Sequence, residues 1–179
     1  MISFASLEAS ASFNNPLAML HACHGKILAQ CATLRKLSSH LADNGCDLQA
    51  QQAAQNILRY FDTSGQFHHQ DEEENLFPTL RLNAAVGKPA VDALLDHLLA
   101  DHVVMAAAWT ELRGVLLQLA KGENASLADT LLDKFITSYT NHIELEERDL
   151  LPLAARLLNP QQTEQIGQHM AERRGVKLK

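Results

Sequence analysis

The sequence predicts an all-α protein, an up-and-down antiparallel four-helix bundle with a short extra helix at its C-terminal end. Leu and Ala recur at helical spacing along most of the 179 residues, whereas the alternating apolar runs typical of strands are few. The 8 Gly and 5 Pro gather in a few places, where they can end one helix and begin the next. Aromatic residues make up only 5% of the chain, which suits a core of closely packed Leu and Ala.

The predicted helices span 16–44, 47–80, 88–121, 126–157 and 160–174. Pro16 and Pro160 each follow an Asn cap and stand at the first helical position, where proline is favoured. Gly45 and Gly122 end the first and third helices. Ser126, with Asp three residues later, resembles a capping box and predicts the start of the fourth helix. A Ser-Gly pair is the one weak point inside the second helix.

Length and charge limit the classes of protein that fit. We expect one domain over 15–158, preceded by an extension over 1–14 and followed over 159–179 by the short helix and a frayed basic tail. The net charge of −6 and the lack of a basic stripe argue against a nucleic-acid partner. No run of 18 apolar residues and no secretory signal are visible, so we expect a cytoplasmic protein without a membrane partner. The three cysteines lack metal-ligand spacing and are predicted to be free thiols.

The chain contains an internal repeat. A shift of 74 residues superposes 58–78 on 132–152 with nine identical positions, among them one Phe, one His, two Glu and one Pro. A shift of 78 residues pairs the first and third helices at five positions, which is weaker support in a sequence rich in Leu and Ala. The bundle is therefore predicted to consist of two helical hairpins related by a pseudo-twofold axis.

Each long helix carries an imidazole on its apolar face. In the two repeat copies the order is Phe, His, Glu and Leu at steps of seven, four and four: Phe61, His68, Glu72 and Leu76, then Phe135, His142, Glu146 and Leu150. This spacing puts His and Glu on the same face as the core residues. His24 and His102 occupy comparable positions in the first and third helices.

These residues point to a metal centre because buried charges need compensation of several kcal/mol. Imidazole and carboxylate without thiolate suit iron or manganese better than structural zinc. Four His, two bridging Glu and one bridging oxide or hydroxide would fill ten of the twelve positions on two octahedral ions, which leaves two open for a small ligand. Taken singly, a core-facing His is more often a hydrogen-bonded core residue, and one His-Glu pair is as often an exposed helical pair. The recurrence of the pair at matched register favours the metal.

The sequence closely resembles the hemerythrin-like (HHE cation-binding) family. The resemblance rests on LHACHGKIL, FHHQDEEENLFPTL, LLADHVVM and YTNHIELEERDLLPLA, in this order, and covers residues 15–158. It implies the hemerythrin bundle and an oxo- or hydroxo-bridged centre of two iron ions. It also implies that the terminal ligands are His24, His68, His102 and His142 and that the bridging ligands are Glu72 and Glu146.

The match has departures from the oxygen-carrying hemerythrins. Ala106 stands where those proteins have a second His on the third helix, so a fifth His ligand must come from elsewhere. His69 is the candidate, and His21 is an alternative or an outer partner of the ligands. The fourth helix has Glu146 where the oxygen carriers have a shorter Asp, so reversible oxygen carriage does not follow. The other histidines, His40, His97 and His169, are predicted to lie at the surface.

Three functions fit these residues. The first is a di-iron protein that binds dioxygen or nitric oxide at an open coordination position. The second is an iron-handling protein, or one that reduces oxygen or peroxide, in iron homeostasis or stress repair. The third is a bundle whose metal completes the core or senses iron. Small-ligand binding is favoured over committed enzyme activity. Ferritin-like oxidase chemistry is disfavoured because no His has Glu three residues before it.

Overall fold

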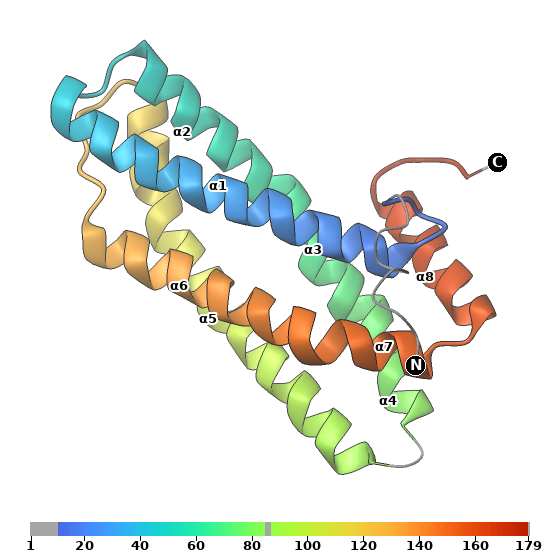
Figure 1. Ribbon diagram of the computed structural model, residues 1–179. Coiled ribbons are helices and arrows are strands. Elements are labelled where there is room, and N and C mark those ends of the chain that lie inside the picture. The colour runs from blue at the N-terminus through green and yellow to red at the C-terminus, as the bar shows by residue number, and fades with distance from the viewer. Residues whose placement is uncertain (1–10, 85–86, 179) are drawn as a thin grey trace. The chain divides into compact units, whose positions relative to one another are not determined.

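The computed structural model describes residues 11–84 and 87–178, and the chain is helical over most of these ranges (Figure 1). The α-helices are α1 Pro16–Asn44, α2 Leu48–Tyr60, α3 Gln66–Asp71, α4 Phe77–Asn83, α5 Lys88–Ala120, α6 Asp129–Leu145, α7 Leu151–Leu157 and α8 Pro160–Arg173. The described ranges contain no strand, only one isolated bridge between Ser12 and Asn15. The prediction of an all-α bundle with an additional C-terminal helix is confirmed.

Two of the predicted long helices are continuous but contain wider, π-helical turns. Between α2 and α4 these turns are η2 Phe61–Gly65 and η3 Glu72–Leu76, and between α6 and α7 the turn is η4 Glu146–Leu150. The predicted weak point at the Ser-Gly pair coincides with η2, whereas η3 and η4 were not predicted. The turns η3 and η4 are offset by the 74 residues of the repeat, so the two copies share this distortion.

Prolines explain the positions of η3 and η4. Pro78 and Pro152 each stand just after the turn, within the first two positions of the next α-helix. A proline inside a helix has no N–H to donate, and its ring collides with the carbonyl four residues earlier. A turn with one extra residue relieves that collision without ending the helix.

Two predicted helix ends coincide with glycines, whereas one predicted helix start is wrong. The first and third helices end before Gly45 and Gly122, which adopt φ of +70° and +79°. The fourth helix starts at Asp129 and not at Ser126, so the capping-box prediction is wrong. Residue 127, a leucine, is buried in the irregular segment before the helix, and Ala128 supplies the first carbonyl that accepts helical hydrogen bonds. Asp129 lies in the first turn, where a carboxylate favours the helix dipole.

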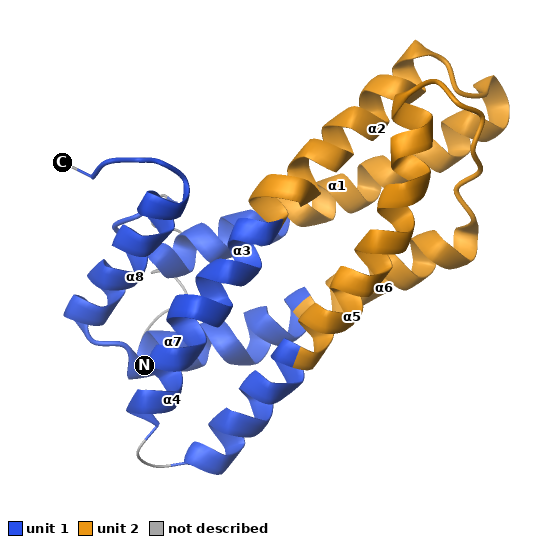
Figure 2. Ribbon diagram, turned by 180° about the vertical axis from the view of Figure 1, so that it is seen from behind, with its two compact units in different colours: residues 1–25, 66–99, 143–179 blue, residues 26–65, 100–142 orange. Residues whose placement is uncertain are grey.

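The described chain forms two compact units, each built from several segments (Figure 2). Unit 1 comprises residues 1–25, 66–99 and 143–179, and unit 2 comprises 26–65 and 100–142. The core of unit 1 consists of buried aliphatic and aromatic side chains: Leu20, Leu76, Phe77, Leu80, Ala84, Val91, Leu95, Leu98, Leu150, Leu151, Ala154, Ile166 and Met170. All four long helices and α8 contribute to it.

Unit 2 has an aromatic cluster in its core. The Phe61 ring lies 5.1 Å from that of Phe135, 5.0 Å from Trp109 and 5.5 Å from Tyr139. Phe61 and Phe135 are the matching residues of the repeat, so the two copies meet here. The Trp109 indole N–H donates to the Asp62 carboxylate at 3.1 Å, which satisfies its polar atom.

Helix α5 is the one described helix whose length and composition would suffice to cross a membrane. That is weak support for a membrane span, because the core helix of a bundle has the same features. Its leucine stripe is fully buried, with Leu95 and Leu98 in unit 1 and Leu112, Leu116 and Leu119 in unit 2. The absence of a membrane partner stays a prediction.

Helix α8 is an integral part of unit 1. Asn159 caps its first turn in a reciprocal capping box with Gln162. The Gln162 amide also exchanges two hydrogen bonds with the Asn83 amide at the end of α4, at 2.7 and 3.0 Å. Further along, a Cβ on Gly167 would lie 1.8 Å from the carbonyl oxygen of Phe13, so only glycine permits this approach.

Gly167→Ala is expected to destabilise the protein by about 2 kcal/mol or more, because the backbone of residue 13 must move away from α8. Gly114→Ala is the matched control. Its added methyl meets nothing within 4 Å, so it should stabilise the helix by up to about 1 kcal/mol. Urea unfolding followed by circular dichroism measures both, and equal stabilities for the two variants would contradict the close approach.

Candidate metal centre

Four polar side chains converge in the interior of unit 1. His24 comes from α1, His68 from α3, and Glu72 and Glu146 from the first positions of η3 and η4. One ligand atom from each residue lies within 4.8 Å of the ligand atoms of the other three. None of the four residues is more than 2% exposed. The structure thus brings together four of the seven predicted site residues within one unit.

The distances inside this cluster connect both copies of the repeat. His68 Nε2 lies 3.5 Å from Glu72 Oε1, one helical turn further along. His24 Nε2 lies 3.1 Å from Glu146 Oε2, and His68 Nε2 lies 4.0 Å from the same oxygen. The rings of His24 and His68 meet edge to face with centroids 4.9 Å apart. Glu146 is therefore close to imidazoles from two other helices.

The wide turns set the direction of both glutamates. The Glu72 carbonyl accepts from the amide of Phe77, and the Glu146 carbonyl accepts from the amide of Leu151, five residues on in each case. Wide turns of this kind are frequent at functional sites because they re-aim a side chain without breaking the helix. In this cluster the distortion begins at the carboxylate residue itself.

A third glutamate supports His24 from outside the cluster. Glu147 Oε1 lies 2.5 Å from His24 Nδ1, and the same carboxylate lies 2.8 Å from Nδ1 of the half-exposed His21. A carboxylate on the second nitrogen fixes the tautomer and orientation of an imidazole whose other nitrogen binds metal. His21 thus contacts the carboxylate that holds His24, and its role as an alternative ligand or an outer partner stays a prediction.

Burial and mutual repulsion govern the charges in the cluster. Complete burial raises the pKa of Glu72 well above its ordinary value, and the nearby Glu146 raises it further. Burial alone would lower the pKa of His24, but hydrogen bonds and charges from Glu146 and Glu147 outweigh it and raise that pKa to about 9. Burial likewise opposes the effect of the two histidines on Glu147, whose pKa nevertheless falls below its ordinary value. Without a cation, His24 therefore carries a proton near neutral pH.

Two of the three other predicted ligands lie in unit 2. His102 and His142 are 4% and 1% exposed, and their Nε2 atoms lie 3.0 Å apart. His142 Nδ1 lies 3.3 Å from the Asp101 carboxylate, which sequence reasoning did not select. His142 with Asp101 resembles His24 with Glu147. In both, a carboxylate lies beside Nδ1 of the imidazole and Nε2 faces the buried side.

The donor set of unit 1 fits a metal cation. It offers two imidazole nitrogens and two carboxylates and contains no thiolate, a combination that suits iron or manganese. A cation would compensate two carboxylates buried together, which otherwise hold protons or repel each other.

Comparison with known proteins agrees with this chemistry. The profile of the hemerythrin HHE cation-binding domain matches residues 15–154. The chain belongs to the hemerythrin HHE cation-binding family. An uncharacterized protein of Haemophilus influenzae is 32% identical over 167 residues, which cover 93% of this chain and 94% of that protein. The match and the buried cluster together make this a cation-binding domain of the hemerythrin type.

The other histidines of this hemerythrin-like chain lie outside the cluster. His69 is half-buried in unit 1, and its ring centroid lies 5.8 Å from that of His68, so its role as a fifth ligand stays a prediction. His97 is exposed, as predicted. His40 contacts Asp47 at 3.0 Å and His169 contacts Glu172 at 3.5 Å, so both have a carboxylate that the sequence analysis did not assign.

One carboxylate of the acidic segment before α4 is buried. A run of acidic residues such as 71–74 usually forms a solvated face, but Asp71 is only 1% exposed. Arg173, the last residue of α8, and Arg174 directly after it bind this carboxylate. No local signal in the sequence connects residues about a hundred positions apart.

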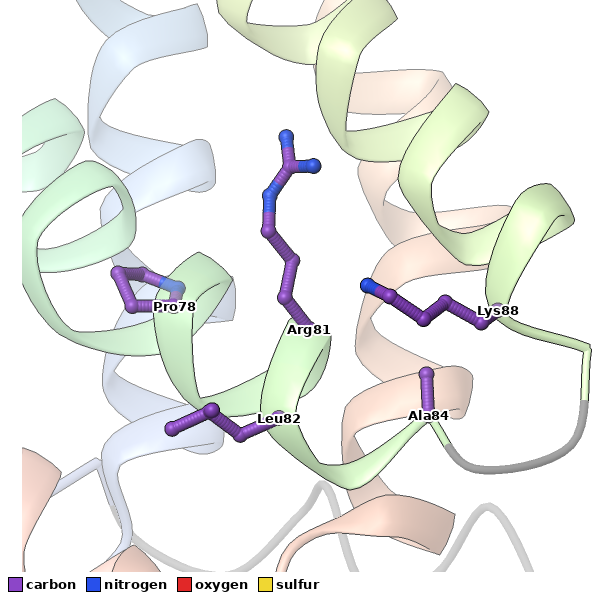
Figure 3. A pocket seen from close by; sticks show the side chains of 5 residues that line it. All are labelled: Pro78, Arg81, Leu82, Ala84 and Lys88. Carbon is purple, nitrogen blue, oxygen red and sulfur yellow. The ribbon is translucent and has the colours of Figure 1, made fainter.

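A surface hollow beside α4 is separate from the cluster of His24, His68, Glu72 and Glu146. Pro78, Arg81, Leu82, Ala84 and Lys88 line it, and Figure 3 shows these side chains on α4, just after it and at the start of α5. None of the predicted ligands is among them. The Arg81 guanidinium forms an ion pair with Asp96 at 2.6 Å. The wall of the hollow is therefore mostly apolar, and its arginine is already paired.

The metal-free protein is expected to lose stability as the pH rises from about 6.5 to 9. A group whose pKa is higher in the folded than in the unfolded protein stabilises the folded state at pH values below its unfolded-state pKa. This stabilisation is lost as the pH rises through the folded-state pKa. For His24 the shift from 6.5 to about 9 corresponds to at most about 3 kcal/mol. Urea unfolding in the presence of a chelator at pH 6.5, 7.5 and 9 measures the change.

The matched variants for this experiment are Glu147→Gln and His21→Gln. The first removes one of the two carboxylates that raise the pKa of His24, so the pH dependence should become smaller. The second leaves both carboxylates beside His24, so the dependence should persist. A wild-type stability that does not change over this pH range would contradict the assigned protonation.

Proposed function

We propose that this protein is a non-haem di-iron protein that binds a small diatomic ligand, dioxygen or nitric oxide. The proposed ligands are His24, His68, His102 and His142 as terminal donors, Glu72 and Glu146 as bridges, and His69 as the candidate fifth imidazole. The observation that carries the proposal is the fully buried set of two imidazoles and two carboxylates in unit 1.

Two further observations support two ions rather than one. The set in unit 1 already contains two carboxylates, each of which can bridge two metal ions. Unit 2 contains a second buried imidazole pair, with its own supporting carboxylate. His142 also stands four residues before Glu146 on one continuous helix, as His68 does before Glu72.

The residues of the chain determine what such a centre can do. When bound, iron would supply open coordination positions and redox chemistry for a small ligand. Glu147 binds Nδ1 of His24, which leaves Nε2 facing the cluster as a metal ligand. The four residues in unit 1 are buried in a unit whose core is apolar, which favours small apolar ligands over bulky or charged substrates.

His142→Ala or Glu146→Ala should sharply reduce the iron bound per chain while helicity stays largely intact. His97→Ala, an exposed imidazole on α5, is the control and should retain full iron. Plasma mass spectrometry of protein produced with iron and purified without chelator gives the metal content, and circular dichroism gives the helicity. About two irons per wild-type chain is expected. Full iron in the two site variants, or near-zero metal or a single zinc in folded wild type, would refute the assignment.

Small-ligand binding predicts a reversible spectrum. The reduced, iron-loaded protein exposed to air should return to its starting absorption spectrum when equilibrated with argon, because a ligand that only binds also leaves. An irreversible change to the oxidised form would instead support the alternative, an iron-handling protein or one that reduces oxygen or peroxide. The cytoplasmic location and the absence of a nucleic-acid partner remain proposals that rest on composition and charge.

A further inference from the structure

The C-terminal end of α8 binds one face of the helix that carries His68 and Glu72. Asp71 is 1% exposed, and both of its carboxylate oxygens accept from arginines: Oδ1 from Arg173, and Oδ2 from Arg174 at 2.6 Å. Arg173 also donates to Glu74 at 2.6 Å and to Asn75 at 3.0 Å. Asp71 directly precedes η3, and the other two residues lie within it.

Arg174 is itself held in place. Its guanidinium donates to the Met170 carbonyl at 2.9 Å, which satisfies one of the last carbonyls of α8. It also lies over the Phe67 ring, 5.6 Å from the centroid. Both arginine side chains are mostly buried, at 14% and 19% exposed. Figure 2 shows α8 beside α3, and the two helices are in contact.

The contacted residues form one stripe next to the metal-binding stripe. Phe67, Asp71, Glu74 and Asn75 follow helical spacing, and each of the first two stands one position before a predicted ligand. A π-helical turn is a rare departure from the α-helix, so it needs support from its surroundings. The arginine pair provides contacts at the start and in the middle of η3.

The second copy of the repeat lacks this support. The positions that correspond to Asp71, Glu74 and Asn75 are Leu145, Arg148 and Asp149. Arg148 pairs with its own neighbour Asp149 at 2.8 Å on the exposed surface, so η4 receives its arginine from within the turn. Residues 160–178 also lie outside the part of the chain that the family profile matches. The arginines that bind beside η3 therefore come from a segment outside the region that the family profile matches.

We propose that Arg173 and Arg174 are positioning residues of the metal centre: by binding Asp71 they hold the η3 turn, and with it Glu72, in the arrangement that retains the metal. This inference rests on the proposed iron site. The helix α8 thereby becomes a retention element that slows the loss of metal from unit 1. The arginines bind Asp71, Glu74 and Asn75, so their effect on Glu72 passes through the backbone of η3.

The test compares R173Q/R174Q with R81Q. Arg81 is the matched control because it is an arginine of the same unit whose two carboxylate partners, Asp92 and Asp96, lie on α5 and not on η3. Amide hydrogen exchange of the metal-free proteins reports the η3 turn over 72–77 and the η4 turn over 146–151. Transfer of iron from the loaded proteins to an excess of chelator reports retention.

In R173Q/R174Q, we expect exchange over 72–77 to accelerate about tenfold relative to 146–151. Iron release should accelerate about tenfold or more, as is typical when an outer partner of a metal ligand is lost. R81Q should match wild type in both measurements. Equal acceleration over both turns, or the same iron release in R173Q/R174Q and R81Q, would overturn the proposal.

A milder variant keeps the test decisive if R173Q/R174Q does not fold. R173K retains the charge but loses the fork that reaches several acceptors at once, so its iron release should also exceed that of R81Q. Release equal to that of R81Q would overturn the proposal. If wild type binds no iron, the proposed function fails together with this inference. If wild type binds iron and release is unchanged in the arginine variants, only this inference fails.

Discussion

The burial of two carboxylates inside a core of Leu and Phe is the constraint on which the rest of unit 1 depends. Glu72 and Glu146 are fully inaccessible and lie together with two imidazoles, an arrangement that is costly without a cation or protons. The outer contacts compensate part of this cost. Glu147 holds His24, and arginines neutralise Asp71 beside Glu72. The polar groups therefore form layers, with potential ligands inside and their supporting charges outside.

The internal repeat explains why this arrangement recurs at two places in one chain. Each copy has a His, a Glu one turn later and a Pro that forces a wide turn beginning at the Glu. The proline thus acts on the site through the backbone, since the turn it imposes sets the direction of the carboxylate. The two copies differ in their support, because α8 supplies two arginines to η3, whereas η4 relies on Arg148 from its own sequence.

Helix order and most helix ends could be predicted from local signals. Proline fixes φ and lacks an N–H, and glycine can adopt positive φ, so both act on the backbone within a few residues. Pro16, Gly45 and Gly122 therefore mark helix boundaries independently of the tertiary structure. Ser126 failed as a start signal because burial of the neighbouring leucine outweighed a cap. The wide turns were missed because periodicity averages over a whole helix and does not register one additional residue.

For the site, the sequence by itself determined the register: the spacing of His68 to Glu72 puts both side chains on the apolar face of one helix. Only the tertiary structure decided which members of the acidic runs are buried and what they contact. Asp71 and Glu74 look alike in the sequence, yet the first is 1% exposed and the second is at the surface. The reason is physical: burial and pairing depend on side chains from α8 and α1 that are distant in the chain, and only packing brings them together.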